Sequence, residues 1–246
     1  MNGTLPLRPF LPALLVASLA IAQGRALGAD TAGGGPAVIP LSLKGPGSLT
    51  GVWTRTGPAL QSAGGQPAIT TADGKPIPYQ PKIAQQLAQE QKTGPKPIDA
   101  RSAPWCMPAG LPVMMSPDPD LPLEILETPR QVTVLFGNFG TFRLIHMNAK
   151  HPEDPDPGYF GNSVAHWEGN TLVVDTTALL EKTTVFGAPH SEDMHLVERL
   201  QRIDESTLEN RITVTDPATY TRPWTWVITL KRVPGARVRE YERRPC

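Results

Sequence analysis

The sequence predicts an all-β protein whose strands form an antiparallel barrel or sandwich. Short segments of alternating apolar and polar residues follow one another along the second half of the chain, and turn residues separate them. Helical periodicity is confined to one short stretch. The chain has 246 residues, of which 39% are hydrophobic, so it can form one domain with a substantial core.

The segment 161–177, GNSVAHWEGNTLVVDTT, gives the clearest of these signals. Gly169-Asn170 is typical of a two-residue hairpin turn, because both residues tolerate positive φ. The flanking strands then pair so that residue numbers sum to 339. Alternation places on one face Ser163, Ala165, Trp167, Leu172, Val174 and Thr176, and on the other Asn162, Val164, His166, Glu168, Thr171, Val173, Asp175 and Thr177.

The other elements are predicted from the same two features, alternation and turn residues. About nine strands are expected in total, and one short helix at Pro81–Gln91. Besides the hairpin above, the predicted strands are 49–57, the pair 131–136 and 141–147, the pair 195–203 and 207–215, and the pair 224–233 and 237–241.

Residues 58–129 are predicted to be a proline-rich arm rather than a second domain. A long segment without strong periodicity either carries function or wraps along a surface. From 103 to 129 the density of proline excludes helix and most sheet pairing. We therefore expect an irregular cover packed on the barrel in that part of the arm.

Residues 1–29 have the features of a signal peptide and its cleavage region. Arg8 supplies the positive charge, Phe10–Ala22 is a short apolar run, and small residues follow it. A buried helix or a membrane anchor is the alternative, but about 13 residues fall short of the roughly 20 that a spanning helix needs. The sequence thus predicts a periplasmic or secreted protein with a flexible leader at 30–46 and a single barrel domain at 47–246.

The two cysteines, Cys106 and Cys246, are expected to form a disulfide in an oxidising compartment. Two free or intermolecular thiols are the alternative. Lys plus Arg and Asp plus Glu both number 23, so charge predicts no nucleic-acid partner. No further segment is apolar enough to span a membrane, so no integral membrane segment is expected in the mature protein.

Glu198 stands out because alternation along 195–203 places it on the same face as leucines. A carboxylate on an apolar face either forms an ion pair, here with Arg143 or Arg211, or acts as a general acid or base in a cavity. Two further residues are candidate proton carriers. His195 begins the same predicted strand as Glu198, and Asp216 lies where the chain crosses from one strand to the next.

Asp175 and His166 form another candidate pair, since they lie diagonally on one face of the hairpin. No Ser or Cys has the context of an activated nucleophile. The acidic loop 151–159 and the stretch His190–His195 lack metal-binding spacing, so we expect a solvated loop, no metal and no cofactor.

Gly51-x-Trp53 on the first strand, with Lys231 and Arg232 on a late strand, is similar to lipocalin-like barrels. In those barrels a Trp closes one end and a late basic side chain stacks across it. The resemblance refines the predicted fold to an antiparallel lipocalin-like barrel.

The chain from Trp105 to Cys246 also resembles a group of exported bacterial proteins with the pattern G-[HN]-S-x-x-x-W-E-G-[DN]-T-L-V-V-D-T. Here this block is Gly161–Thr176, with Asn162 where histidine is usual and Asn170 where aspartate is usual. The other shared blocks are Cys106–Pro112, His195–Arg199 and Asp216–Trp224. The resemblance implies export and names no activity.

The leading functional hypothesis is binding of a small apolar or aromatic molecule inside the barrel. Glu198 would orient such a ligand, and the expected binding residues are Trp167, Trp224, Ser163 and Trp105. The first alternative is a cofactor-independent lyase, isomerase or hydrolase acting on such a molecule, with protons carried by Glu198, His195, Asp216, Asp175 and His166. The second alternative is a structural or interaction protein whose barrel is solid.

Overall fold

The computed structural model describes residues 48–56, 69, 71–93, 107–137 and 140–239. All of them belong to one compact unit, Ile39–Cys246. The predicted signal peptide and leader lie outside the described residues, as do Trp105 and the predicted disulfide between Cys106 and Cys246.

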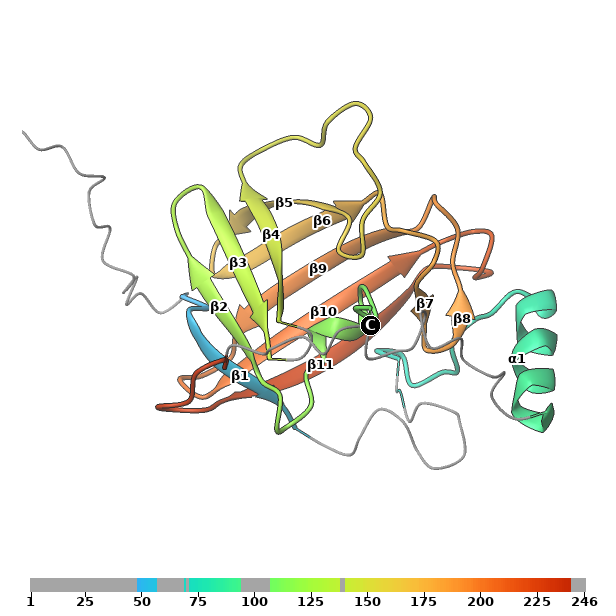
Figure 1. Cartoon of the computed structure of the whole chain (residues 1–246), viewed down its shortest axis with the longest axis horizontal. Coiled ribbons are helices and arrows are strands. Elements are labelled where there is room, and N and C mark those ends of the chain that lie inside the picture. Colours follow the sequence, from blue (N-terminus) through green and yellow to red (C-terminus); the bar gives the residue numbers. More distant parts are fainter. Residues whose placement is uncertain (1–47, 57–68, 70, 94–106, 138–139, 240–246) are drawn as a thin grey trace, which may run out of the picture. The chain divides into compact units, whose positions relative to one another are not determined.

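Strands dominate the described chain (Figure 1). The strands are β1 (Gly51–Arg55), β2 (Leu123–Glu127), β3 (Gln131–Phe136), β4 (Thr141–Met147), β5 (Asn162–Glu168), β6 (Thr171–Thr177), β7 (Thr184–Val185), β8 (Ala188–Pro189), β9 (His195–Arg202), β10 (Thr207–Thr215) and β11 (Trp224–Arg232). The helical elements are α1 (Pro81–Thr93), as predicted and two residues longer, and a 3₁₀ turn at Val113–Met115.

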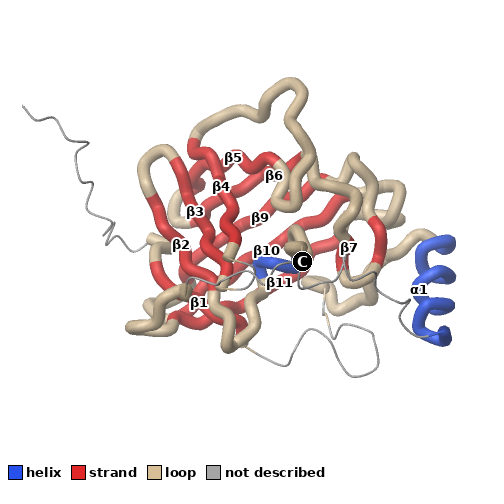
Figure 2. Tube along the Cα trace, in the orientation of Figure 1, coloured by secondary structure: helices blue, strands red, loops and turns tan. Residues whose placement is uncertain are grey.

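Nine strands close into a barrel in the order β1-β11-β10-β9-β6-β5-β4-β3-β2, which confirms the predicted all-β barrel (Figures 1 and 2). Eight of the nine pairings are antiparallel, and β4 pairs with β5 in parallel. The expectation of a wholly antiparallel barrel is corrected here. Strand directions cannot alternate all the way around a closed ring with an odd number of strands, so one parallel contact is required.

The hairpin β5–β6 has the predicted register. Asn162 pairs with Thr177 and Glu168 with Thr171, so every pair sums to 339. Ser163, Ala165, Leu172, Val174 and Thr176 are buried, which identifies their face as the inside of the barrel. Trp167, on the same face near the turn, is 37% exposed.

Two expectations about strands are wrong. Residues 237–239 form no strand, and β11 pairs with β1 instead, which closes the barrel. The proline-rich stretch 103–129 contains β2, because the run Leu123–Glu127 lies between Pro122 and Pro129 and holds no proline itself. Exchanging the predicted last strand for β2 leaves nine strands in the barrel.

One end of the barrel is closed by Trp53, which is fully buried. Its indole Nε1–H donates to the carbonyl of Leu49 at 2.8 Å, and the guanidinium carbon of Arg232 lies 5.4 Å from the ring centroid. Glu127 secures the chain entering β1, since its Oε2 accepts from the backbone N–H groups of Leu49 and Thr50. The predicted stacking of a late basic side chain on the first-strand Trp is thus present, while the lipocalin relationship stays a prediction.

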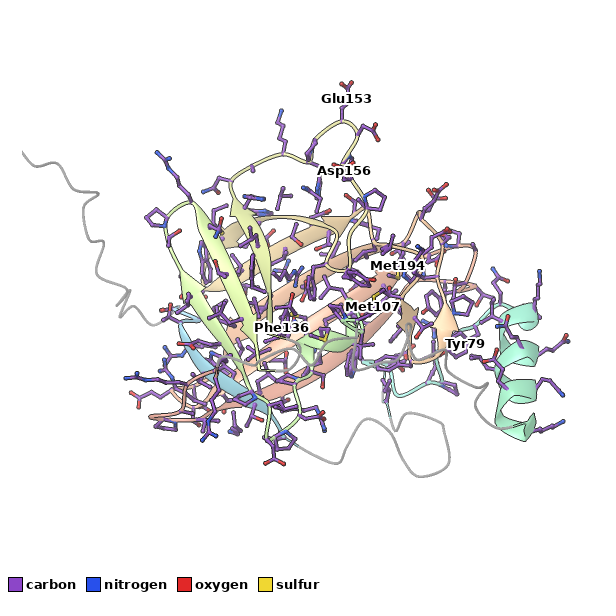
Figure 3. The ribbon with its side chains drawn as sticks, viewed as in Figure 1. Tyr79, Met107, Phe136, Glu153, Asp156 and Met194 are labelled. Atoms are coloured by element: carbon purple, nitrogen blue, oxygen red, sulfur yellow. The ribbon has the colours of Figure 1, made fainter. Side chains whose placement is uncertain are left out.

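Apolar side chains also pack inside the barrel and at its opposite end. Leu111 and Met115, from the segment before β2, are fully buried there, and Phe160 stacks on Phe136 with ring centroids 5.2 Å apart. Figure 3 labels Phe136 and one further side chain of this buried cluster, Met194. In the part of the chain that the structure describes, no helix has the length and apolar character needed to cross a membrane.

Candidate functional site

A cluster of two histidines and one aspartate lies on the outer face of β5, β6 and β9. Asp175 belongs to β6, His195 begins β9, and His151 comes from the loop that joins β4 to β5. Alternation turns Asp175 outward while its neighbours Val174 and Thr176 are buried inside the barrel. We call His151, Asp175 and His195 the outer cluster.

One carboxylate oxygen joins the outer cluster. Nε2 of His151 and Nε2 of His195 each lie 2.9 Å from Oδ1 of Asp175. The side chains are partly open to solvent, at 25% for His151, 37% for His195 and 41% for Asp175. Solvent and small molecules can therefore reach groups that are also held by hydrogen bonds.

Asn162 fixes the second nitrogen of His151, because its Oδ1 lies 2.7 Å from Nδ1. Both ring nitrogens of His151 thus face oxygen acceptors. The protonated ring can donate to both oxygens, whereas a neutral ring can donate to only one. His151 is in this way held between Asn162 and Asp175.

The β4–β5 loop positions His151 over the barrel. A parallel connection must carry the chain back along the barrel, so 148–161 crosses the outer face. Gly158 ties the loop down, because its N–H donates to the carbonyl of Ala178 at 3.0 Å and its carbonyl accepts from Leu180. The exposed tip carries the acidic residues Glu153 and Asp156, and Figure 3 shows Glu153 pointing away from the barrel.

Gly161 sets the start of β5 beside the cluster. It has a φ of +58°, and a Cβ there would meet the backbone carbonyl oxygen of Thr177. Only glycine permits this close approach, which brings Asn162 next to Thr177 and under His151.

Glu198 does not belong to the outer cluster, because it points into the barrel. Its Oε2 lies 2.5 Å from Nη2 of Arg143, and both side chains are fully buried. Arg143 also donates to Ser163 and Thr176 at 3.1 and 2.9 Å, and Asn210 donates to Glu198 Oε1 at 2.9 Å. Of the alternatives open for Glu198, the ion pair with Arg143 is the one formed.

These five side chains, Arg143, Ser163, Thr176, Glu198 and Asn210, form the inner network. Oε2 of Glu198 is in contact only through the ion pair, and two further atoms, Nη1 of Arg143 and Oδ1 of Asn210, have no hydrogen-bond partner among the described residues. A buried donor and acceptor without partners are costly, so a water or another small polar group would be held there.

Asp216 holds two loops together. Its carboxylate accepts from the backbone N–H and the hydroxyl of Ser191 at 2.9 and 2.8 Å, and from the N–H of Ala218. Burial acts to raise its pKa, but hydrogen bonds from Ser191, Thr219 and Ala218 outweigh it and leave the pKa below its usual value. Asp216 is therefore suited to a structural role and lies outside the outer cluster.

The remaining predicted residues do not converge on one site. His166 is bonded to Glu168 at 3.2 Å rather than to Asp175. Trp224 is buried against Tyr220, with ring centroids 5.5 Å apart, while Trp167 lies near the β5–β6 turn, toward the other end of the barrel. Ser163 belongs to the inner network.

Neither the outer cluster nor any other group of three His, Cys, Asp or Glu side chains in the described ranges is arranged to hold a metal ion. A surface depression of about 460 Å³ lies at the Trp53 end, lined by Glu205, Ser206, Arg232 and Pro234, and is not part of either polar group.

Of the five predicted proton carriers, the structure brings together Asp175 and His195. Sequence reasoning missed His151 and Asn162 as their partners. The hairpin register already placed Asn162 on the face of Asp175, but the path of the β4–β5 loop leaves no periodic signal in the sequence.

Comparison with known protein families, with curated proteins and with solved structures gives no match to this chain.

Proposed function

We propose that the protein is a cofactor-independent enzyme that transfers protons at the outer cluster, as a lyase, isomerase or hydrolase of a small apolar or aromatic molecule. One observation carries the proposal: two histidines from different segments share a single, partly exposed carboxylate oxygen. Imidazole groups oriented by a carboxylate are suited to general acid–base work near neutral pH.

In this proposal His195 is the general base. Its Nε2–H donates to Asp175, so the neutral ring presents the Nδ1 lone pair to a substrate. Asp175 orients the ring and stabilises the imidazolium that forms when Nδ1 takes the proton. The proton that Nδ1 of His195 takes is returned from the same nitrogen to the product or is released to solvent, and His151, held by Asn162, keeps Asp175 in position.

The interior of the barrel supports a second candidate function, binding of a small molecule, for one specific reason. Nη1 of Arg143 and Oδ1 of Asn210 are buried donor and acceptor atoms without partners in the described chain. A ligand with one acceptor and one donor would satisfy both. Native mass spectrometry, compared before and after denaturation, tests this candidate, because a carried ligand adds mass that denaturation removes.

The enzyme proposal is tested with p-nitrophenyl acetate for hydrolysis and with hydrogen–deuterium exchange of acetophenone for proton abstraction. We expect wild-type turnover in one of the two assays and a loss of about 10²- to 10⁴-fold in His195→Gln. His166→Gln is the matched control, since His166 is an exposed histidine on the same face that contacts Glu168 instead. Equal rates in wild type, His195→Gln and His166→Gln would overturn the proposal.

A further inference from the structure

A surface depression lies at the end of the barrel that Trp53 closes. Its volume is about 460 Å³, and its lining residues are Glu205, Ser206, Arg232 and Pro234. This volume is within the range of sites that hold small molecules. Two turns form its walls, because the β9–β10 turn supplies Glu205 and Ser206 and the turn after β11 supplies Pro234.

Hydrogen bonds hold the two walls in place. The backbone N–H of Arg232 donates to the carbonyl of Ser206 at 2.8 Å, and the N–H of Val233 donates to the carbonyl of Val52 in β1 at 2.9 Å. Within the β9–β10 turn, the carboxylate of Asp204 accepts from the N–H and the hydroxyl of Ser206 at 2.7 and 2.9 Å. The depression is therefore formed before a ligand arrives, which lowers the entropy lost on binding.

The guanidinium of Arg232 is fixed on three sides. Its carbon lies 5.4 Å from the centroid of the Trp53 ring, and Nη2 donates to the carbonyl of Thr50. On the third side lies Gly51, where a Cβ would come within 2.6 Å of Nη2, so the glycine makes room for the guanidinium. The positive charge is thus held in one position beside the depression.

Two opposite charges line the depression without pairing with each other. Arg232 forms no ion pair with a described residue, and the carbonyl of Thr50 is the one described acceptor for the five N–H groups of its side chain. Glu205 is exposed and likewise has no ion-pair partner in the described ranges. The hydroxyl hydrogen of Ser206 is directed to Asp204, so its oxygen can accept a further hydrogen bond.

The neighbouring charged side chains have partners of their own. Lys231 donates to the hydroxyl of Thr207 at 2.5 Å, and Asp204 accepts from the same hydroxyl at 2.8 Å. Arg202 donates to three backbone carbonyls, including that of Ser48 at 3.1 Å. A ligand in the depression would therefore meet one cation, one anion and one hydroxyl acceptor from the described residues.

We propose that the depression binds a free α-amino acid in its zwitterionic form. The carboxylate of the ligand would accept from two N–H groups of Arg232, the paired geometry that a guanidinium favours. Its ammonium group would donate to the Ser206 hydroxyl oxygen and to the carboxylate of Glu205, and its side chain would pack on Pro234. A ligand with a single charge would leave one of the two lining charges unmatched. This inference does not depend on the proposed enzymatic activity.

Titration of the full chain with L-phenylalanine, followed by NMR, tests the proposal. The signals to follow are the backbone amide of Ser206 and the side-chain Nε–H of Arg232. Two matched ligands each lack one charge: N-acetyl-L-phenylalanine lacks the ammonium group and L-phenylalaninamide lacks the carboxylate. L-phenylalanine should bind with a Kd lower by about tenfold or more than either of them.

Three variants assign the two charges. Arg232→Met should weaken binding of L-phenylalanine by about tenfold or more and remove its preference over L-phenylalaninamide. Glu205→Gln, at an exposed turn position, should reduce the preference over N-acetyl-L-phenylalanine. Arg237→Met is the matched control and should bind as wild type does, since Arg237 is an exposed arginine that does not line the depression.

Three results would overturn the proposal. They are unchanged Ser206 and Arg232 signals at millimolar L-phenylalanine, equal affinity for the three ligands, and wild-type affinity in Arg232→Met. Binding of N-acetyl-L-phenylalanine as tight as that of L-phenylalanine would also overturn it, and would identify a site for simple carboxylates instead.

Discussion

The inner network and the outer cluster use the same strands and differ in what surrounds them. On β6, Thr176 belongs to the inner network and its neighbour Asp175 to the outer cluster. On β5, Ser163 belongs to the inner network, and its neighbour Asn162 contacts His151 of the outer cluster. Inside, the ion pair is shielded from solvent. Outside, the carboxylate and both histidines are partly exposed.

A shift of one residue along a strand thus separates a structural role from a chemical one. The inner ion pair is fully buried, so its removal should lower the stability of the protein. The outer cluster is reachable from solvent, so its removal should reduce turnover. The predictions below test this division, from the largest effect to the smallest.

Glu198→Gln should destabilise the protein by about 3–5 kcal/mol, because it leaves Arg143 charged and buried without a counter-ion. Urea unfolding followed by Trp fluorescence measures the change. Glu168→Gln is the control, since it breaks an exposed pair with Arg199 and should have a far smaller effect.

The double variant Arg143→Met with Glu198→Leu should be more stable than Glu198→Gln, since no buried charge then remains. A double variant less stable than the single one would show that the hydrogen bonds to Ser163 and Thr176 matter more than the ion pair.

Asp175→Leu should reduce turnover in the p-nitrophenyl acetate or acetophenone assay by about 10²-fold or more, because both histidines lose their shared acceptor. The urea midpoint should change little, since Asp175 is partly exposed on the outer face. A large loss of stability with unchanged turnover would mean that the outer cluster stabilises the fold and takes no part in the reaction.

Asp216→Asn should cost about 1–3 kcal/mol at pH 7, because the charged acceptor of the Ser191 and Ala218 hydrogen bonds is lost. The pKa of Asp216 is lowered in the folded protein, so its contribution is present above the unfolded pKa and disappears as pH falls through the folded pKa. Urea unfolding at pH 7 and at pH 3 should show that wild type and variant differ less in their free energy of unfolding at the lower pH. An equal difference in the free energy of unfolding at both pH values would mean that the charge of Asp216 plays no part. Asp154→Asn, in the exposed β4–β5 loop, is the control.

Arg232→Met should give the smallest effect, a loss of about 0.5–1 kcal/mol from the contact with the Trp53 ring. Thermal unfolding should show a small decrease, and Arg232→Lys should recover part of it. A loss several times larger would mean that the contact of Arg232 with the carbonyl of Thr50 dominates.

The sequence predicts local features of this fold better than long-range ones. The Gly169-Asn170 turn fixes the register of the β5–β6 hairpin, and alternation correctly turns Glu198 inward and Asp175 outward. The pairing of β11 with β1 and the parallel β4–β5 contact depend on barrel closure, which no local pattern encodes. β2 was missed because the prolines around it hid a five-residue run without proline.

The candidate site was half predictable for the same reason. Asp175 and His195 lie on strands, where alternation gives their faces. Their meeting required the β6–β9 pairing, which joins strands separated by β7 and β8. His151 required the course of the β4–β5 loop, and a loop has no period from which to place a side chain.

NMR of the histidine ring nitrogens in wild type and Asp175→Leu tests the central claim most directly, because it needs no substrate. The chain has five histidines, and the two of the outer cluster share Asp175. We predict that the substitution changes the ring ¹⁵N signals of His151 and His195 together and leaves those of His166 and His190 unchanged. If His151 and His195 keep their wild-type signals, the shared carboxylate does not exist in solution and the proposed proton-transfer site is wrong.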